Sequence, residues 1–172
     1  VAILTEAGIG TTIPELGADA RSTWGVYAAG AAGFDLRAEH GPQGWTLSGT
    51  KPWCSLADRL SHAIITANVS DTEQRAFAIR LDPEQVTALP GVWVSRGLAD
   101  ITSPAIKLRA APSVPVGEAG WYLSRPGFAW GGIGVGAVWY GIALALRERL
   151  RRSGAAREPD QIAEMHLGSV DR

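Results

Sequence analysis

Cysteine and histidine are scarce in this chain. Among 172 residues there is one cysteine, Cys54, and the three histidines, His40, His62 and His166, lie far apart in the sequence. A zinc site needs Cys or His ligands at short spacings, and a disulfide framework needs paired cysteines. The sequence therefore predicts neither a metal site nor a fold held together by disulfides.

An excess of charge of either sign is also missing. The formal net charge is -1 at pH 7, with 16 Lys and Arg residues against 17 Asp and Glu residues. Domains that bind nucleic acid usually carry a basic patch or a high isoelectric point, so this function is disfavoured. No charged segment precedes an apolar stretch at the start of the chain, and we expect a cytoplasmic protein.

Generic catalytic signatures are absent as well. The sequence has no Gly-x-Ser-x-Gly elbow, no phosphate loop ending in Gly-Lys-Ser/Thr, no His-Glu-x-x-His helix and no Cys pair. The glycines at 131–136 lack the Gly-x-Gly-x-x-Gly spacing that follows a strand in dinucleotide-binding folds. A Rossmann-type site is therefore not expected.

What the sequence does contain is a long β pattern over residues 24–116. Short runs rich in Val, Ile, Trp, Thr and Leu are broken by turn residues about every 8 to 12 positions. Strands are predicted at 24–29, 34–39, 44–50, 61–69, 74–81, 91–96 and 104–109. Short antiparallel strands in this number close a small barrel or sandwich.

A different composition begins after Pro126. Residues 127–146 carry no charge, and a basic stretch follows at 147–152. Their length, with the Gly132/Gly136 pair, is typical of a membrane span. Six of these residues are glycine, and each costs a helix about 1 kcal/mol relative to alanine. We favour a buried, glycine-rich helix, and we expect another helix over 158–171.

Residues 44–55 read Gly-Trp-Thr-Leu-Ser-Gly-Thr-Lys-Pro-Trp-Cys-Ser, and an apolar run follows at 62–67. This segment resembles the central β-domain signature of the acyl-CoA dehydrogenase family, where Asn/Ser-Gly-x-Lys leads into an aromatic residue and a small hydroxyl residue. The resemblance implies bound FAD, with Trp53 against one face of the isoalloxazine and Ser55 near its N5 edge. A buried flavin needs such an aromatic wall and a few aimed donors. Without the resemblance, Trp53 would be interpreted as a core residue.

Further downstream, Ser113-Val114-Pro115 resembles the stretch that leaves the β-domain of this family, and Ser124-Arg125-Pro126 resembles the start of its first long C-terminal helix. The pieces occur in the family's order over residues 24–150. The resemblance thus implies an α+β fragment, in which a small antiparallel β-barrel or sandwich precedes the start of an α-helical bundle. Its parts are 1–22 (end of an N-terminal helical region, or a linker), 23–122 (middle β-domain) and 123–172 (start of the helical domain).

The resemblance also implies a set of cofactor-binding residues: Val26, Tyr27, Trp53, Cys54, Ser55, Arg152 and Gln161. Arginine suits a pyrophosphate, although a basic residue at the end of a helix also complements the helix dipole. The family's Thr-Glu-Pro loop is replaced here by 24–33, which lacks its serine. The family's Arg-x-x-Phe-Gly-Lys stretch is likewise replaced, by 152–157.

In the family, a glutamate removes the α-proton of an acyl-CoA thioester while hydride passes to the flavin. The resemblance places that glutamate beyond residue 172, so the catalytic residue is unknown. It implies fatty acid metabolism, an acyl-CoA or related small-molecule substrate, an electron-transfer flavoprotein as partner and a homo-oligomer, without nucleic acid or membrane. One alternative is a flavoprotein of the same fold with other chemistry or no activity. The other is a non-enzymatic β-domain anchored in a membrane by 127–146.

Overall fold

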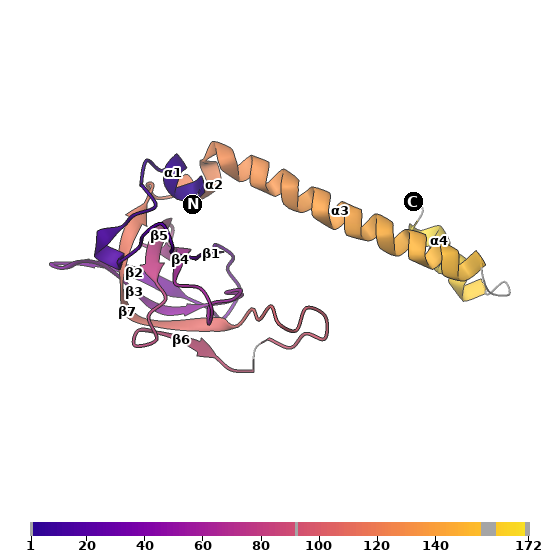
Figure 1. The fold of residues 1–172 in the computed structure, drawn as a ribbon, viewed down its shortest axis with the longest axis horizontal. Coiled ribbons are helices and arrows are strands. Elements are labelled where there is room, and N and C mark those ends of the chain that lie inside the picture. The colour runs from indigo at the N-terminus through magenta and orange to yellow at the C-terminus, as the bar shows by residue number, and fades with distance from the viewer. Residues whose placement is uncertain (1, 92, 156–160, 171–172) are drawn as a thin grey trace. The chain divides into compact units, whose positions relative to one another are not determined.

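The computed structural model describes residues 2–91, 93–155 and 161–170 (Figure 1). The chain divides into two compact units, Val1–Arg125 and Pro126–Arg172. The first unit contains the β-strands and three short helical segments, α1 (Ala2–Glu6), the 3-10 helix η1 (Pro14–Leu16) and α2 (Trp121–Ser124). The second contains α3 (Pro126–Ala155) and α4 (Gln161–Val170).

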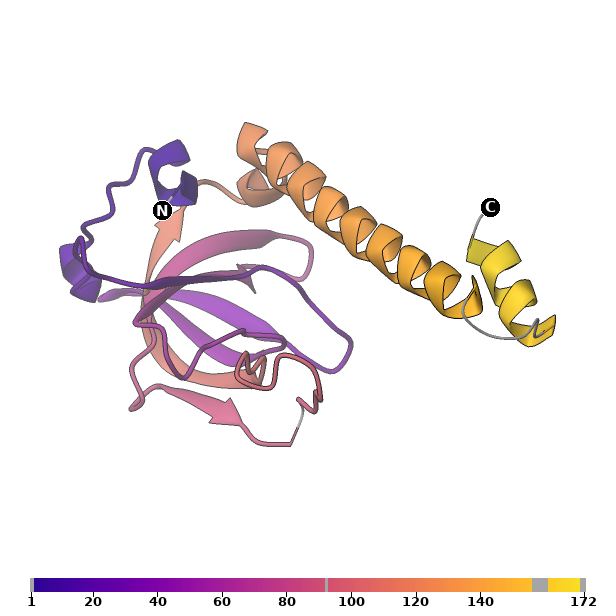
Figure 2. The same ribbon diagram turned by 45° about the vertical axis from the view of Figure 1, so that its right-hand side comes forward.

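A small β-barrel forms the body of the first unit. Its strands are β1 (Trp24–Tyr27), β2 (Leu36–Gly41), β3 (Gly44–Lys51), β4 (His62–Asn68), β5 (Gln74–Arg80), β6 (Val86–Leu89) and β7 (Ala105–Val116). Strands β4, β2, β3, β7 and β5 are hydrogen-bonded in that order, and the pairing of β5 with β4 closes the ring. Figure 2 shows the strands curling round this barrel. The predicted α+β fold, a small antiparallel barrel followed by helices, is confirmed.

Two strands lie outside the ring. β6 pairs with β7, and β1 runs parallel to the first part of β4, from Trp24 opposite His62 to Tyr27 opposite Ile65. β2 meets the same edge of β4 further along, where Arg37 lies opposite Asn68. The chain therefore leaves this edge after β1 and returns to it at β2.

The sixth predicted strand was placed wrongly. The sequence predicts a strand at 91–96, but the pairing with β7 uses Val86–Leu89, and the described residues of 91–96 lie in no strand. Pro90 has no N–H to donate, and Gly91 adopts φ +82°, so the ladder ends at Leu89. The apolar residues of 91–96 were mistaken for a strand because composition does not show which residues pair.

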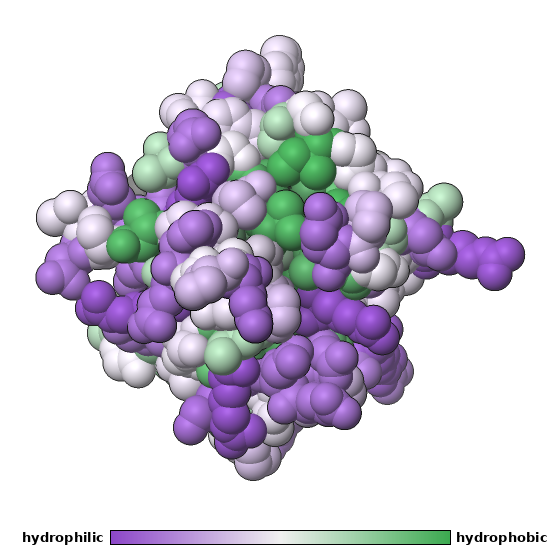
Figure 3. Space-filling model, turned by 90° about the vertical axis from the view of Figure 1, so that its left-hand side faces the viewer, coloured by the Kyte–Doolittle hydropathy of each residue, from purple (hydrophilic) through white to green (hydrophobic). Residues whose placement is uncertain are grey.

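Apolar side chains are buried on both sides of the barrel wall. The interior cluster is built around Leu47, Phe77, Ile79, Ile106 and Leu108. On the outer side, residues of α1 and η1 pack against β4, β5 and β7 in a second cluster that includes Ile3, Leu4, Ile13, Leu16, Ile64, Ala78 and Val116. β4 is buried on both faces, which explains its continuous apolar sequence. Figure 3 shows one side of the molecular surface, which is mostly hydrophilic with small apolar patches.

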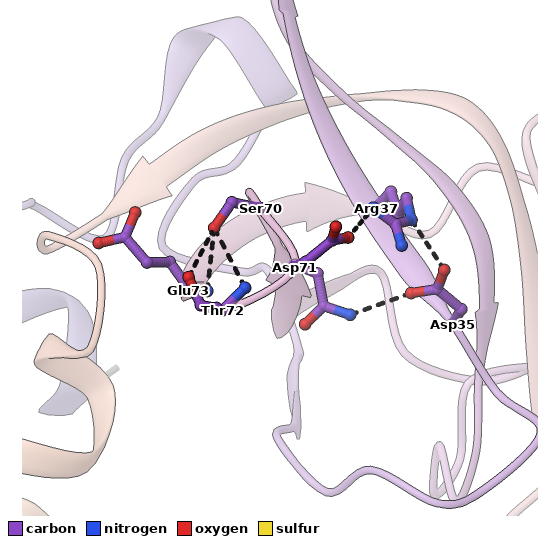
Figure 4. A network of polar contacts seen from close by, with 7 residues as sticks. Asp35, Arg37, Ser70, Asp71, Thr72 and Glu73 are labelled. Atoms are coloured by element: carbon purple, nitrogen blue, oxygen red, sulfur yellow. Dashed lines mark hydrogen bonds and ion pairs between the residues drawn. The ribbon is translucent and has the colours of Figure 1, made fainter.

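Polar side chains hold the seam between β2 and β4 (Figure 4). Arg37 Nε donates to Asp35 Oδ2 at 2.8 Å, and Arg37 Nη1 donates to Asp71 Oδ1 at 3.1 Å. Asn68 Nδ2 donates to Asp35 Oδ1 at 3.0 Å. In the β4–β5 turn, Ser70 Oγ accepts from two backbone N–H groups. The ion pairs are exposed, so each is expected to stabilise the fold little.

Gly49 occupies the most crowded backbone position of β3. The register against β7 shifts between Leu47 and Gly49, and Gly49 adopts φ +127°. A Cβ atom at this position would collide with the carbonyl oxygen of Asp35. The same carbonyl accepts a hydrogen bond from the N–H of Thr50 at 2.7 Å. Only glycine therefore allows β3 and the entry to β2 to approach this closely.

The second unit is dominated by α3, which contains the predicted helix at 127–146. Its burial is not found in the described chain, since apolar side chains along it are exposed: Phe128, Trp130, Ile133, Val135, Val138, Trp139, Tyr140, Ile142, Leu144, Leu146 and Leu150. By length and composition alone, residues 126–153 are apolar enough to cross a membrane. Near its end, Glu148 accepts hydrogen bonds from Arg151 and Arg152, which lower the pKa of its carboxyl to about 2.

Candidate functional site

The loop between β3 and β4 holds an exposed tryptophan in a strained conformation. Trp53 adopts φ +55°, and 51% of its surface is exposed. Leu56, in the same loop, adopts φ +58°. A bulky residue in the left-handed region is an outlier that costs about 1–3 kcal/mol and persists only where the surroundings enforce it. Such strain with an exposed aromatic ring indicates a functional position.

Hydrogen bonds to the segment before β7 enforce this loop conformation. The N–H of Cys54 donates to the carbonyl of Pro104, and the N–H of Leu56 donates to the carbonyl of Thr102, each at 2.8 Å. The hydroxyls of Ser55 and Ser103 are hydrogen-bonded at 2.7 Å. The loop is thus fixed at alternate residues to a neighbouring strip of chain, which makes it a rigid support rather than a mobile connection.

Tyr27, at the end of β1, provides a fourth hydrogen bond that holds the loop. Its hydroxyl donates to the carbonyl of Ser55 at 3.0 Å, and the residue is 97% buried, with 3% of its surface exposed. Burial, with smaller contributions from Cys54 and Asp58, raises the pKa of the Tyr27 hydroxyl well above its usual value. The hydroxyl therefore stays protonated and remains a donor at physiological pH.

Val26, Trp53 and Ser55 are exposed residues on the two segments that Tyr27 joins, and we call these three residues the platform. Val26 precedes Tyr27 in β1, so its side chain points to the opposite face, where 47% of its surface is exposed. Ser55 is exposed beside its partner Ser103. The platform thus combines an aromatic ring, an aliphatic group and a hydroxyl on two backbone segments that Tyr27 ties together. Such a surface can support a flat, largely apolar ligand with a hydrogen-bonding edge.

Cys54 belongs to the buried core next to this site. Its side chain is fully buried, and its Sγ lies 3.5 Å from the carbonyl oxygen of Lys51. Burial raises the pKa of the Cys54 thiol to about 12, although the nearby Lys51 opposes this shift. At neutral pH the thiol is therefore protonated and a poor nucleophile. Cys54 fills the barrel core under the platform.

Lys51 is the residue of this region that sequence reasoning missed. It is 4% exposed, and its Nζ donates to the carbonyl of Thr66 at 2.7 Å and to Thr66 Oγ1 at 2.8 Å. Burial lowers the pKa of its ammonium to about 8. The period-two pattern that places Trp45 and Leu47 inside the barrel also reaches Lys51, so a signal for its burial was present.

Because the pKa of Lys51 is lowered in the folded chain, we expect the stability of the fold to depend on pH. The unfolded chain holds this proton up to its ordinary pKa of 10.5, whereas the folded chain releases it near pH 8. The contribution of Lys51 to the free energy of unfolding should therefore rise from pH 8 to pH 10.5. Urea unfolding of the wild type and of Lys51→Met across this window measures the difference. The sequence has two lysines, Lys51 and Lys107, so the Cε resonances of ¹³C-lysine-labelled protein also report the titration directly.

A wild-type stability that follows the K51M curve across the window, or a Lys51 Cε resonance that titrates at the ordinary lysine pKa of 10.5, would contradict this expectation.

A cleft of about 290 Å³ lies next to the loop. Its walls include Asp58, Ala88, Leu89, Pro90, Gly91, Trp93, Thr102 and Pro104. Thr102 Oγ1 donates to Asp58 Oδ1 at 3.1 Å, which orients the only charged side chain among these wall residues. Among the described residues, no group of three or more His, Cys, Asp or Glu side chains is arranged to hold a metal ion.

The structure brings together five of the residues that the sequence suggested for a cofactor. Val26 and Tyr27 come from β1, and Trp53, Cys54 and Ser55 come from the loop, with Tyr27 joining the two segments. Arg152 and Gln161 belong to the second unit, outside this group. The Arg152 Nε donates to Glu148 Oε1 at 2.8 Å, and Gln161 is the first residue of α4.

No protein-family model and no curated protein matches the chain. Several solved structures have a similar fold. A probable acyl-CoA dehydrogenase from Mycobacterium abscessus matches with a TM-score of 0.61 and 14% identity, over 88% of this chain and 46% of that one. A KijD3 in complex with FMN and dTDP-3-amino-2,3,6-trideoxy-4-keto-3-methyl-D-glucose matches with a TM-score of 0.58 and 21% identity, over 86% and 40%.

A nitrososynthase from Micromonospora carbonacea var. africana matches with a TM-score of 0.56 and 22% identity, over 87% of this chain and 41% of that one. The chain thus spans less than half the length of each of these structures. At these identities the similarity shows the fold: a β-domain followed by the first part of a helical domain. The resemblance to the acyl-CoA dehydrogenase fold that the sequence suggested is confirmed at this level.

Proposed function

We propose that this chain supplies the flavin-supporting β-domain and the first part of the helical domain of an FAD-dependent oxidoreductase of the acyl-CoA dehydrogenase type. The observation that carries the proposal is Trp53, an exposed aromatic ring held at φ +55° on a loop fixed at both edges. The fold supports it, because KijD3, which is similar in fold, is in complex with FMN.

The residues of the platform fit a flavin. The indole of Trp53 offers a flat apolar surface on which an isoalloxazine ring can stack. The Ser55 hydroxyl, already oriented by Ser103, offers a hydrogen bond at the edge of that ring. Val26 extends the apolar wall, and Tyr27 holds both segments without a charge of its own. A site that is rigid before binding needs little reorganisation when the ligand arrives.

Bound FAD would supply the acceptor for a hydride from the substrate. The residues of this chain would bind and orient the flavin, exclude water from one face of it and form part of the substrate pocket. We assign the substrate to the acyl-CoA thioesters, and we assign the α-proton to a glutamate outside these 172 residues. In the same proposal, an electron-transfer flavoprotein receives the electrons, and the protein acts in fatty acid metabolism as a cytoplasmic homo-oligomer that binds neither nucleic acid nor a membrane.

Other flavin chemistry on the same fold is the alternative within this class, and the fold match to a nitrososynthase favours keeping it. A second candidate function belongs to another class. The exposed apolar side chains of α3 favour a non-enzymatic β-domain with a membrane anchor at 127–146, which lies within the stretch that is apolar enough to cross a membrane. The two classes predict different properties. A flavoprotein of this kind is yellow and stays in solution without detergent, whereas a membrane-anchored β-domain is colourless and needs detergent.

The absorbance spectrum of the intact protein that carries this chain, purified without detergent, tests the proposal. We expect a flavin spectrum that bleaches when a fatty acyl-CoA is added anaerobically. A flavin that does not bleach with any acyl-CoA would move the assignment to other flavin chemistry. A colourless protein that does not take up FAD or FMN would refute the proposal, and partition of that protein into membranes would support the anchored β-domain.

A further inference from the structure

Lys51 connects β3 of the barrel to β4, and through Thr66 it is linked to the residue after β1. It is the last residue of β3, and Trp53 follows two positions later. Its ammonium donates both to the backbone carbonyl and to the side-chain oxygen of Thr66 in β4. Both bonds are shorter than 3 Å, and both partners are buried. The start of the Trp53 loop is therefore tied to the centre of β4.

Thr66 continues this connection to β1. Its hydroxyl accepts one hydrogen bond from Lys51 and donates its own proton to the carbonyl of Ala28 at 3.0 Å. Ala28 follows Tyr27 directly after the end of β1. A single chain of hydrogen bonds thus joins the end of β3 to the end of β1. These two ends carry Trp53 and Val26, the two apolar members of the platform.

The connection sits at a gap in the barrel edge. β1 pairs with β4 only as far as Ile65, and β2 meets β4 only at Asn68. Thr66 lies between these two contacts, and among the described strands none pairs with β4 at Thr66 on the side away from β5. The Lys51 ammonium satisfies the Thr66 carbonyl there, and its burial makes the site costly to build for stability alone.

We propose that Lys51 is a positioning residue of the flavin site, which acts through Thr66 to fix the end of β1 against the Trp53 loop. This inference rests on the proposed function. Lys51 sets the separation and tilt of Val26 and Trp53, while it does not touch the flavin itself. The partner in this role is Thr66, whose hydroxyl transmits the constraint to Ala28.

Two substitutions in the intact protein separate this role from general stability. Lys51→Met keeps a similar length but removes the donors, and Thr66→Val keeps the shape but removes the hydroxyl. Lys107→Met is the matched control, because it makes the same chemical change at an exposed lysine of β7. The double variant K51M/T66V completes a double-mutant cycle, which measures whether the effects of the two substitutions are coupled.

Hydrogen exchange of the Cys54 and Leu56 amides measures how stably the loop is hydrogen-bonded, and it needs no bound cofactor. Because these amides bond to Pro104 and Thr102, loss of the connection should speed their exchange about 10-fold in K51M and in T66V, while K107M leaves it unchanged. In the double variant, these amides should exchange no faster than in the more affected single variant. Urea midpoints measured on the same samples show how much of the exchange follows from global unfolding.

Flavin binding gives the functional readout. K51M and T66V should weaken the affinity for flavin about 10-fold and change the fine structure of the bound flavin spectrum, while K107M does neither. If the wild type binds no flavin, the proposed function fails, and the exchange data still decide whether Lys51 holds the loop. If K51M does not fold, T66V carries the test. Exchange rates and flavin affinities in K51M and T66V that equal those of K107M would overturn the inference.

Discussion

Replacing Trp53 by alanine is expected to weaken flavin binding about 10- to 100-fold while the melting temperature stays within about 3 °C of the wild type. The ring is half exposed, so its removal takes little apolar surface out of the core. The stacking surface for the isoalloxazine is lost completely. Titration of the apoprotein with FAD, followed by quenching of flavin fluorescence, measures the affinity.

Trp130→Ala is the matched control, since Trp130 is also exposed, by 76%, but belongs to α3 and is a residue of neither the platform nor the cleft. A Trp53→Gly variant adds a second check, because glycine adopts φ +55° without strain and keeps the loop geometry. W53A and W130A with equal flavin affinities would contradict the stacking role. A large loss of stability in W53A would instead make Trp53 a structural residue.

Replacing Gly49 by alanine is expected to destabilise the fold by about 3–5 kcal/mol. The added methyl group would meet the carbonyl oxygen of Asp35, and the backbone would have to keep φ +127° with a side chain. Relief of the collision would move β3 away from the residues that lead into β2. The free energy of unfolding from urea titrations, followed by tryptophan fluorescence, measures the loss.

Gly44→Ala separates the two contributions. Gly44 also lies in β3 and adopts φ +104°, but a Cβ atom there has no neighbour within 4 Å. We therefore expect a smaller loss of about 1–2 kcal/mol, from backbone strain alone. Equal losses for G49A and G44A would show that strain, and not the contact with Asp35, governs this strand.

The sequence was informative where local chemistry decides the structure. Alternation of large apolar and polar residues located β3, and the apolar run of 62–67 located β4, because both strands bury their side chains in a regular pattern. The glycine-rich stretch was correctly predicted as helix despite its composition. Its predicted burial is not found, since burial depends on which surfaces meet a helix, and a sequence pattern does not contain them.

The candidate site was predictable in part for the same reason. The aromatic and hydroxyl positions at 53 and 55 followed from a motif contained in consecutive residues. The hydrogen bonds that shape the site join residues far apart in the sequence, such as 15 positions for Lys51 with Thr66 and 48 positions for Ser55 with Ser103. The left-handed conformation of Trp53 results from these distant bonds. Local propensity disfavours it and could not have predicted it.

The central place of β7 has a consequence for the order in which the chain folds. β7 pairs with β3, β5 and β6, and its partners in β3 precede it by more than 50 residues, as in Lys51 opposite Ile106. The hairpins β2–β3 and β4–β5 form from neighbouring sequence, whereas every contact of β7 with β3 closes a long loop. On the ribosome, the first strands must therefore wait with an open edge until residues 105–116 have been synthesised and released. During that interval, the exposed edges of β3 and β5 are the part of the nascent chain most in need of a chaperone.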